Sequence, residues 1–80
     1  NKALPLFREA LALATKGPGP DNLVTLVVME NLADCQRQLG ACDESVRLHL
    51  EVLERCKAKF GPVDRATLRA MNGLALAYQA

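Results

Sequence analysis

Apolar side chains recur every three or four residues along four stretches of this chain, the spacing of a helix with one buried face. The stretches cover residues 1–16, 22–39, 42–60 and 65–80. Glycine and proline separate them, and no segment keeps the alternation of period two that marks a strand. The pattern therefore predicts an all-α protein of four helices.

The helix ends are marked by residues with strong local preferences. The Gly-Pro-Gly-Pro run at 17–20 is expected to end the first helix, because proline lacks an N–H donor and glycine favours turns. Asp21 or Asn22 is expected to cap the second helix and Asp64 the fourth. Gly40 is expected to end the second helix in a left-handed conformation. Pro5 is compatible with the first helix if it lies near the start.

Each helix has one line of residues expected to face the core. Small residues allow helices to approach closely, and Ala33, Ser45 and Ala75 are predicted to mark such contacts. The full predicted lines are Leu4, Phe7, Leu11 and Ala14 in the first helix; Leu26, Met29, Leu32, Ala33 and Gln36 in the second; Val46, His49, Leu50, Leu53, Cys56 and Phe60 in the third; and Leu68, Met71, Leu74, Ala75 and Tyr78 in the fourth.

The chain also repeats itself with a period of 42 residues. Laid on residues 43–80, residues 1–38 are identical at ten positions, which include Gly19-Pro20 on Gly61-Pro62 and Thr25-Leu26 on Thr67-Leu68. A fixed period of this length is typical of stacked repeats, in which one unit cannot bury its apolar face alone. Such arrays usually present a surface to a partner, so the repeat favours binding over catalysis.

Three segments in register with this repeat resemble the tetratricopeptide repeat in its long, 42-residue form, found in kinesin light chains. Residues 3–11, ALPLFREAL, are similar to the family's E-A-x-P-L-[YF]-x-E-A-L pattern. Residues 19–26 with Asn31-Leu32-Ala33 are similar to G-x-D-H-P-x-T-L followed by N-L-A, and residues 39–45 to its Q-G-x-x-x-E-A turn. The chain departs from the pattern at His-Pro, replaced by Asn22-Leu23 and Asp64-Arg65, and at Gln36, Ser45, His49 and Gly73.

The resemblance covers all 80 residues and implies antiparallel helix hairpins stacked as a right-handed α-solenoid. A repeat of this family consists of helix A followed by helix B. Residues 1–16 would be helix B of a preceding repeat, 22–60 one complete repeat and 64–80 helix A of the following repeat. Neither end shows a polar cap, and the chain begins with Asn1. We therefore expect these residues to be a piece of a longer array, with further repeats of the same chain on both sides.

In this family helix A lines a concave groove, and the resemblance assigns partner binding to that face. An Asn such as Asn31 can bond both the N–H and the C=O of an extended peptide, and Arg37 and Arg69 can bind carboxylates. Each position is also compatible with an ordinary solvated side chain. The predicted partner-binding residues, called the helix-A face below, are Val27, Glu30, Asn31, Asp34, Arg37, Gln38, Arg69, Asn72, Leu76 and Gln79.

The favoured hypothesis is a scaffold that binds a peptide or docks a subunit, and the resemblance implies cargo or adaptor binding around microtubule motors. The first alternative is a structural strut inside a large complex. RNA binding is a second alternative, disfavoured by a net charge of +1 and a single tyrosine. A third is an accessory segment of an enzyme whose catalytic domain lies elsewhere.

Composition argues against chemistry and against a membrane span. No stretch approaches the roughly 18 apolar residues of a spanning helix. Cys35, Cys42 and Cys56 form no C-x-x-C pair, which favours a reducing, cytoplasmic compartment, and the family adds a cytoskeletal association. His49 is the only histidine and lies on a packing line, so neither a metal site nor a catalytic residue is expected. No cofactor is predicted.

Overall fold

A computed structural model describes residues 2–79 and contains four α-helices. They are α1 (Ala3–Lys16), α2 (Leu23–Gln38), α3 (Cys42–Phe60) and α4 (Arg65–Gln79). Each predicted helix is present close to its predicted ends, and residues 2–79 contain no strand. Positions 1 and 80 of the predicted first and fourth helices lie outside the described residues. The all-α fold class is confirmed.

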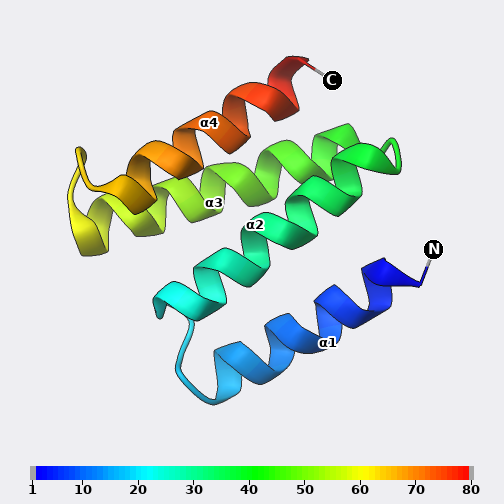
Figure 1. The fold of residues 1–80 in the computed structure, drawn as a ribbon, viewed down its shortest axis with the longest axis horizontal. Helices are drawn as coiled ribbons and strands as arrows, with labels where there is room; N and C mark the ends of the chain where they lie inside the picture. Colours follow the sequence, from blue (N-terminus) through cyan, green and yellow to red (C-terminus); the bar gives the residue numbers. More distant parts are fainter. Residues whose placement is uncertain (1, 80) are drawn as a thin grey trace.

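The helices follow one another in chain order, and successive helices run in opposite directions (Figure 1). Each packs against the next, and α2 also contacts α4, so α2 touches all three of the others. The result is a flat molecule measuring 34 × 31 × 15 Å. Within residues 2–79, no helix combines the length and the apolar character needed to cross a membrane.

The helix ends confirm the local signals in the sequence. The Asn22 carboxamide oxygen accepts a hydrogen bond from the Val24 N–H at 2.9 Å, and Asp64 Oδ1 accepts one from the Ala66 N–H at 2.9 Å. Gly40 follows α2 with a φ of +89°, in the left-handed region. Pro5 lies in the first turn of α1, where its missing N–H has no helical partner to lose.

The 42-residue repeat of the sequence is also a repeat of structure. Thr25 Oγ1 donates a hydrogen bond to the Gly19 carbonyl at 2.6 Å, and Thr67 Oγ1 donates one to the Gly61 carbonyl at 2.6 Å. Both threonine side chains are fully buried. The same side chain therefore ties the same loop to the start of α2 and of α4.

The core lies where α2, α3 and α4 meet. A hydrogen bond joins two of these helices, because Ser45 Oγ on α3 donates to the Ala33 carbonyl on α2 at 2.8 Å. Both residues are fully buried, which confirms the predicted close approach. The core cluster consists of Leu26, Met29, Val52, Leu53, Cys56, Ala66 and Ala70, with Leu11, Leu48, Phe60 and Leu74 packed against it.

The C-terminal half of α3 holds the loop between α1 and α2. Arg55 Nη1 donates to the Pro20 carbonyl at 2.9 Å, and Lys59 Nζ donates to the Asp21 carbonyl at 2.7 Å. Arg55 also pairs with Glu51 one turn earlier on the surface of α3. Both cations therefore donate hydrogen bonds to loop carbonyls, and Lys59 also lies in the last turn of α3, where a positive charge favours the negative end of the helix dipole.

The burial predicted for α4 is wrong at four of five positions. Leu68, Met71, Ala75 and Tyr78 are exposed, and only Leu74 is half-buried. The side of α4 that is buried carries Ala66, Thr67, Ala70 and Ala77, which face the rest of the molecule. The equivalents of the four exposed residues on α2 are covered by α3, whereas no helix of the described chain lies in that place beside α4.

The predicted line of α2 is buried throughout, whereas α3 buries three of its six predicted residues and α1 only one of its four. The buried members include Ala14, Leu32, Gln36 and His49. The third-helix prediction is wrong at Leu50, which is 38% exposed because it lies at the margin of the line formed by His49 and Leu53. Five further members are half-buried: Leu4, Phe7, Leu11, Val46 and Phe60.

Candidate functional site

All ten residues of the predicted helix-A face reach the surface of α2 and α4. Six are exposed and four are half-buried. The exposed ones are Asn31, Gln38, Arg69, Asn72, Leu76 and Gln79, and the half-buried ones are Val27, Glu30, Asp34 and Arg37. None is part of the core cluster. The face is accessible, as binding requires.

Opposite charges meet across the junction of α2 and α4. Burial raises the pKa of Glu30 above its ordinary value, while Arg69 on α4 acts in the opposite direction and Asp34 adds to the rise. The two helices therefore place an acidic and a basic side chain within electrostatic reach of each other. Asn72, Leu76 and Gln79 are exposed and extend the surface along α4.

A second charged group lies one turn further along α2. Arg37 Nη2 is 4.0 Å from Asp34 Oδ1, and His49 Nε2 on α3 is 3.5 Å from the same oxygen. Asp34 is thus shared between its own helix and α3. The Arg37 Nε has no hydrogen-bond partner among residues 2–79, so this cation is only partly satisfied.

A hollow of about 250 Å³ opens between α1 and the C-terminal half of α2. Three members of the helix-A face line it, namely Asn31, Asp34 and Gln38. Phe7 and Ala3 of α1 contribute the apolar part of the wall, with Cys35 and Leu39. The hollow therefore combines amide, carboxylate and aromatic groups, and it has the volume of one large side chain.

The contact between His49 on α3 and Gly73 on α4 was not predicted from the sequence. His49 is 1% exposed, and neither of its ring nitrogens makes a hydrogen bond to another described residue. A Cβ atom at Gly73 of α4 would lie 2.8 Å from His49 Cε1 and 2.9 Å from Nδ1. The imidazole therefore occupies the space that a side chain at position 73 would need. Burial lowers the pKa of His49, although Asp34 acts in the opposite direction.

The sequence contained a signal for this pair. His49 and Gly73 are both departures from the repeat pattern, and 42 residues earlier the same two positions hold Phe7 and Asn31. The two exceptions are linked, because the glycine makes room for the ring. His49 is consequently a packing residue.

Groups suited to chemistry are not assembled at this face. Burial raises the pKa of the Cys56 thiol, with Glu30 adding to the rise and Arg69 opposing it, so the thiol keeps its proton at neutral pH. Between Lys2 and Gln79, no group of three or more His, Cys, Asp or Glu side chains could hold a metal ion.

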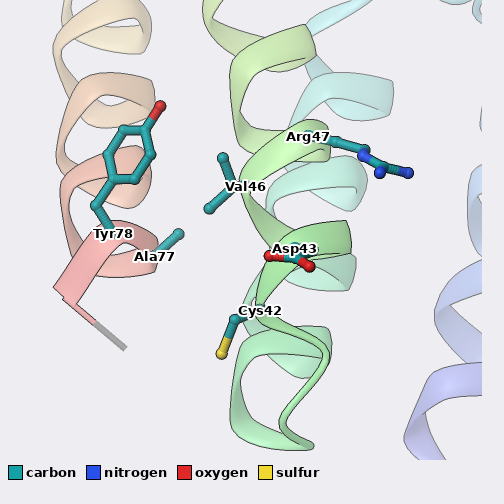
Figure 2. A pocket seen from close by; sticks show the side chains of 6 residues that line it. All are labelled: Cys42, Asp43, Val46, Arg47, Ala77 and Tyr78. Atoms are coloured by element: carbon teal, nitrogen blue, oxygen red, sulfur yellow. The ribbon is translucent and has the colours of Figure 1, made fainter.

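A hollow of about 400 Å³ lies between the C-terminal end of α4 and the start of α3. Figure 2 shows Ala77 and Tyr78 on α4 opposite Cys42 and Val46 on α3, with Arg47 directed away from Tyr78. This hollow borders the exposed residues of α4. The four residues Leu68, Met71, Ala75 and Tyr78 are called the open face below.

Comparison with known proteins agrees with the helix hairpins described above. The sequence model of the tetratricopeptide repeat matches residues 1–58, which is well over half of the chain. Searches of curated proteins and of solved structures found no match. The match covers α1, α2 and most of α3, and α4 repeats α2 in sequence and in its loop hydrogen bond. The chain therefore belongs to the tetratricopeptide repeat family.

Proposed function

We propose that this chain is a non-catalytic protein-interaction scaffold that binds an extended peptide, or docks a partner subunit, on its helix-A face. The observation that carries the proposal is the hollow beside α2, where three of the predicted residues line one cavity. Tetratricopeptide repeats generally act as protein-interaction scaffolds, and membership of that family supports the same reading.

The hollow has the donors and acceptors needed to hold a peptide backbone. The exposed Asn31 and Gln38 carboxamides each offer both a donor and an acceptor, so they can bond the N–H and the C=O of an extended chain. A side chain of that peptide can enter the hollow against Phe7. This arrangement tolerates many sequences at the backbone and selects at one side chain.

Charge on the face gives a second means of selection. Arg69 is exposed, and its planar guanidinium can bind a carboxylate in bidentate fashion. Arg37 is less available to bind a carboxylate of a partner, because its Nη2 already lies 4.0 Å from Asp34 Oδ1. A peptide with an acidic residue near Arg69 is therefore the preferred partner.

The finer family assignment belongs to the same proposal. The period of 42 residues, with equivalent threonine bonds at both loops, supports the long form of the repeat that kinesin light chains contain. We propose a right-handed solenoid that continues on both sides, with residues 22–60 as its complete repeat. Three free cysteines favour a reducing cytoplasmic setting, and kinship with motor-associated arrays suggests a cytoskeletal one.

A structural strut is the second candidate function, and one observation favours it. Leu68, Met71 and Tyr78 are large side chains that are exposed along one side of α4. Exposed apolar patches of this kind mark contact with another surface. A strut would contact its neighbour through the open face, and the helix-A face would bind no partner.

Affinity purification of the tagged protein tests the two candidates against each other. The variant Asn31→Ala/Arg37→Ala removes an amide and a cation from the helix-A face. The control Lys57→Ala removes a cation from an exposed position of α3, away from that face. Helicity and thermal stability are measured for each variant, so that loss of a partner is not confused with unfolding.

The scaffold predicts that the double variant loses one specific partner while Lys57→Ala retains it. If both variants recover the same partners as the unmodified protein, the helix-A face does not bind them. If the partners are instead lost on substituting the open face, the strut is the better description.

A further inference from the structure

One carboxylate of the helix-A face lies between two basic side chains. Asp34 Oδ1 is 4.0 Å from Arg37 Nη2 on the same helix and 3.5 Å from His49 Nε2 on α3. Both distances are longer than that of a well-formed hydrogen bond, so the carboxylate is fixed to neither group. The Asp34 side chain is 45% exposed, and it therefore has room to rotate toward either one.

The two basic groups both lack partners. His49 is 1% exposed, and neither ring nitrogen has a hydrogen-bond partner among residues 2–79. The Nε of Arg37 is buried and also lacks a partner within that range. A buried polar group without a partner costs free energy, and the cost is larger when the group is charged. Arg37 and the protonated form of His49 therefore compete for the single carboxylate of Asp34.

The surroundings of the ring leave Asp34 as its acidic partner. Burial lowers the pKa of His49, Asp34 raises it and Arg37 lowers it, so the ring is neutral at neutral pH. On α4, Gly73 lies against the ring, and the nearest charged residue along that helix is Arg69, one turn away. On α3 itself, the positions one turn before and one turn after the ring hold no charged residue.

We propose that Asp34 is a counter-ion exchanged between Arg37 and His49, and that this exchange controls how well Arg37 binds a carboxylate of the partner. While the ring is neutral, Asp34 pairs with Arg37 and competes with the partner's carboxylate. When His49 takes up a proton from solvent, Asp34 turns to the ring and Arg37 is released. The proposal rests on the proposed function, since it describes regulation of the helix-A face.

This exchange links the protonation of His49 to the binding of an acidic peptide. A partner carboxylate that replaces Asp34 at Arg37 leaves Asp34 free to stabilise the charged ring, so binding should raise the pKa of His49. By reciprocity, binding should strengthen as the pH falls. The window lies below the ordinary pKa of 6.5, because burial lowers the pKa of His49, and glutamate side chains of the partner are still ionised there.

Titration of His49 by NMR tests the exchange without any ligand. His49 is the only histidine, so its ring resonances are identified directly. Arg37→Gln should raise the pKa of His49, because Asp34 is then free to turn to the ring, and Asp34→Asn should lower it. Arg47→Gln is the control, because it removes the same charge from an exposed position of α3 outside this group and should leave the pKa of His49 unchanged.

A double-mutant cycle separates exchange from direct repulsion between the two basic groups. Exchange predicts that Arg37→Gln raises the pKa of His49 when Asp34 is present and leaves it nearly unchanged in an Asp34→Asn background. Direct repulsion predicts an equal rise in both backgrounds, and that result would overturn the proposal. Circular dichroism verifies that each variant stays helical across the titration.

An acidic probe then tests the consequence for binding. The probe is a short peptide of alternating glutamate and alanine with blocked ends, and its binding is followed through the backbone amide resonances of α2. The unmodified chain should bind it about fivefold more tightly at about pH 5.5 than at about pH 7.5. His49→Leu should lose most of this gain, and whatever gain it keeps belongs to the titration of Glu30 beside Arg69.

The possible results separate this proposal from the proposed function. Equal affinity of the unmodified chain at both pH values, or an undiminished gain in His49→Leu, would contradict the regulation by His49 and leave the helix-A face as a binding surface. A probe that binds at neither pH would contradict both the regulation and the preference for acidic peptides. The pKa cycle needs no probe, so it decides in either case whether Asp34 is exchanged.

Discussion

The fit between His49 and Gly73 is the tightest residue-scale feature of the molecule. A methyl group at Gly73 would lie 2.8 Å from His49 Cε1, closer than such atoms approach in proteins, and the ring is buried. We expect Gly73→Ala to lower the free energy of unfolding by about 1 kcal/mol, because overpacking outweighs alanine's better helix propensity. Urea denaturation measures the change.

The same substitution should act in the opposite direction once the ring is gone. In a His49→Ala background, the methyl group added by Gly73→Ala meets no imidazole ring. The higher helix propensity of alanine should then raise stability by up to about 1 kcal/mol. This reversal of sign is a coupling between two residues in contact. Equal effects in both backgrounds would show that the ring and position 73 do not compete for space.

His49 should also make stability depend on pH. Burial lowers its folded-state pKa below the ordinary value of 6.5, so the unfolded chain binds the proton more tightly. Its contribution is therefore fully present above the unfolded pKa and is lost as pH falls through 6.5 towards the folded value. Urea denaturation at a series of pH values should show this loss.

The matched control for this pH dependence is His49→Leu, which cannot titrate. Asp34 and Arg37, the charged groups nearest the ring, remain in both proteins. Glu30 also remains, and its raised pKa makes its own contribution grow more favourable as pH falls. The difference between the two proteins therefore isolates His49, and a difference that is flat across the window would contradict the lowered pKa.

At the scale of elements, the two threonine bonds test whether the loops are equivalent. Thr67→Val removes the donor to the Gly61 carbonyl in a buried site, and we expect a loss of about 1–2 kcal/mol. Thr25 Oγ1 donates to the Ala14 carbonyl as well as to the Gly19 carbonyl, but Thr25→Val should cost less, because each of these carbonyls also accepts from a backbone N–H. Thermal denaturation of both variants, with Thr67→Ser as the hydroxyl-bearing control, checks the order. A larger loss at Thr25 would contradict it.

Sequence reasoning predicted the elements well because their ends depend on local chemistry. Asn22 and Asp64 cap helices, and Gly40 takes a left-handed conformation, for reasons that a few neighbouring residues decide. Burial on α4 was predicted wrongly because it depends on a neighbouring helix. Leu68 has the same side chain and the same position in the repeat as Leu26, yet only Leu26 has α3 beside it.

At the scale of the whole molecule, some features of the candidate site could be predicted from the sequence, and others depend on how the helices pack. Periodicity was enough to place Asn31 and Arg69 on accessible sides of two adjacent helices. The hollow beside α2 was not predictable, because its wall includes Phe7 from α1 and its shape depends on how the two helices cross. The distance from His49 to Gly73 likewise required the packing of α3 on α4.

Substitution of the two equivalent methionines, Met29 and Met71, shows how much stability a covering helix contributes to the molecule. Met29 is 3% exposed in the core, so Met29→Ala should lower the free energy of unfolding by about 2–5 kcal/mol. Met71 occupies the same repeat position but is 39% exposed, so Met71→Ala should cost less than about 1 kcal/mol in dilute solution. Urea denaturation at low micromolar concentration compares them.

The expected difference follows from the surroundings of each side chain, because truncating a covered methionine leaves a cavity, whereas an exposed methionine loses only part of its buried apolar area. Helix α3 covers Met29, with Arg55 Nη1 3.9 Å from its sulfur, whereas Met71 is exposed on α4. Equal costs for the two substitutions in dilute solution would mean that Met71 is already covered in the monomer.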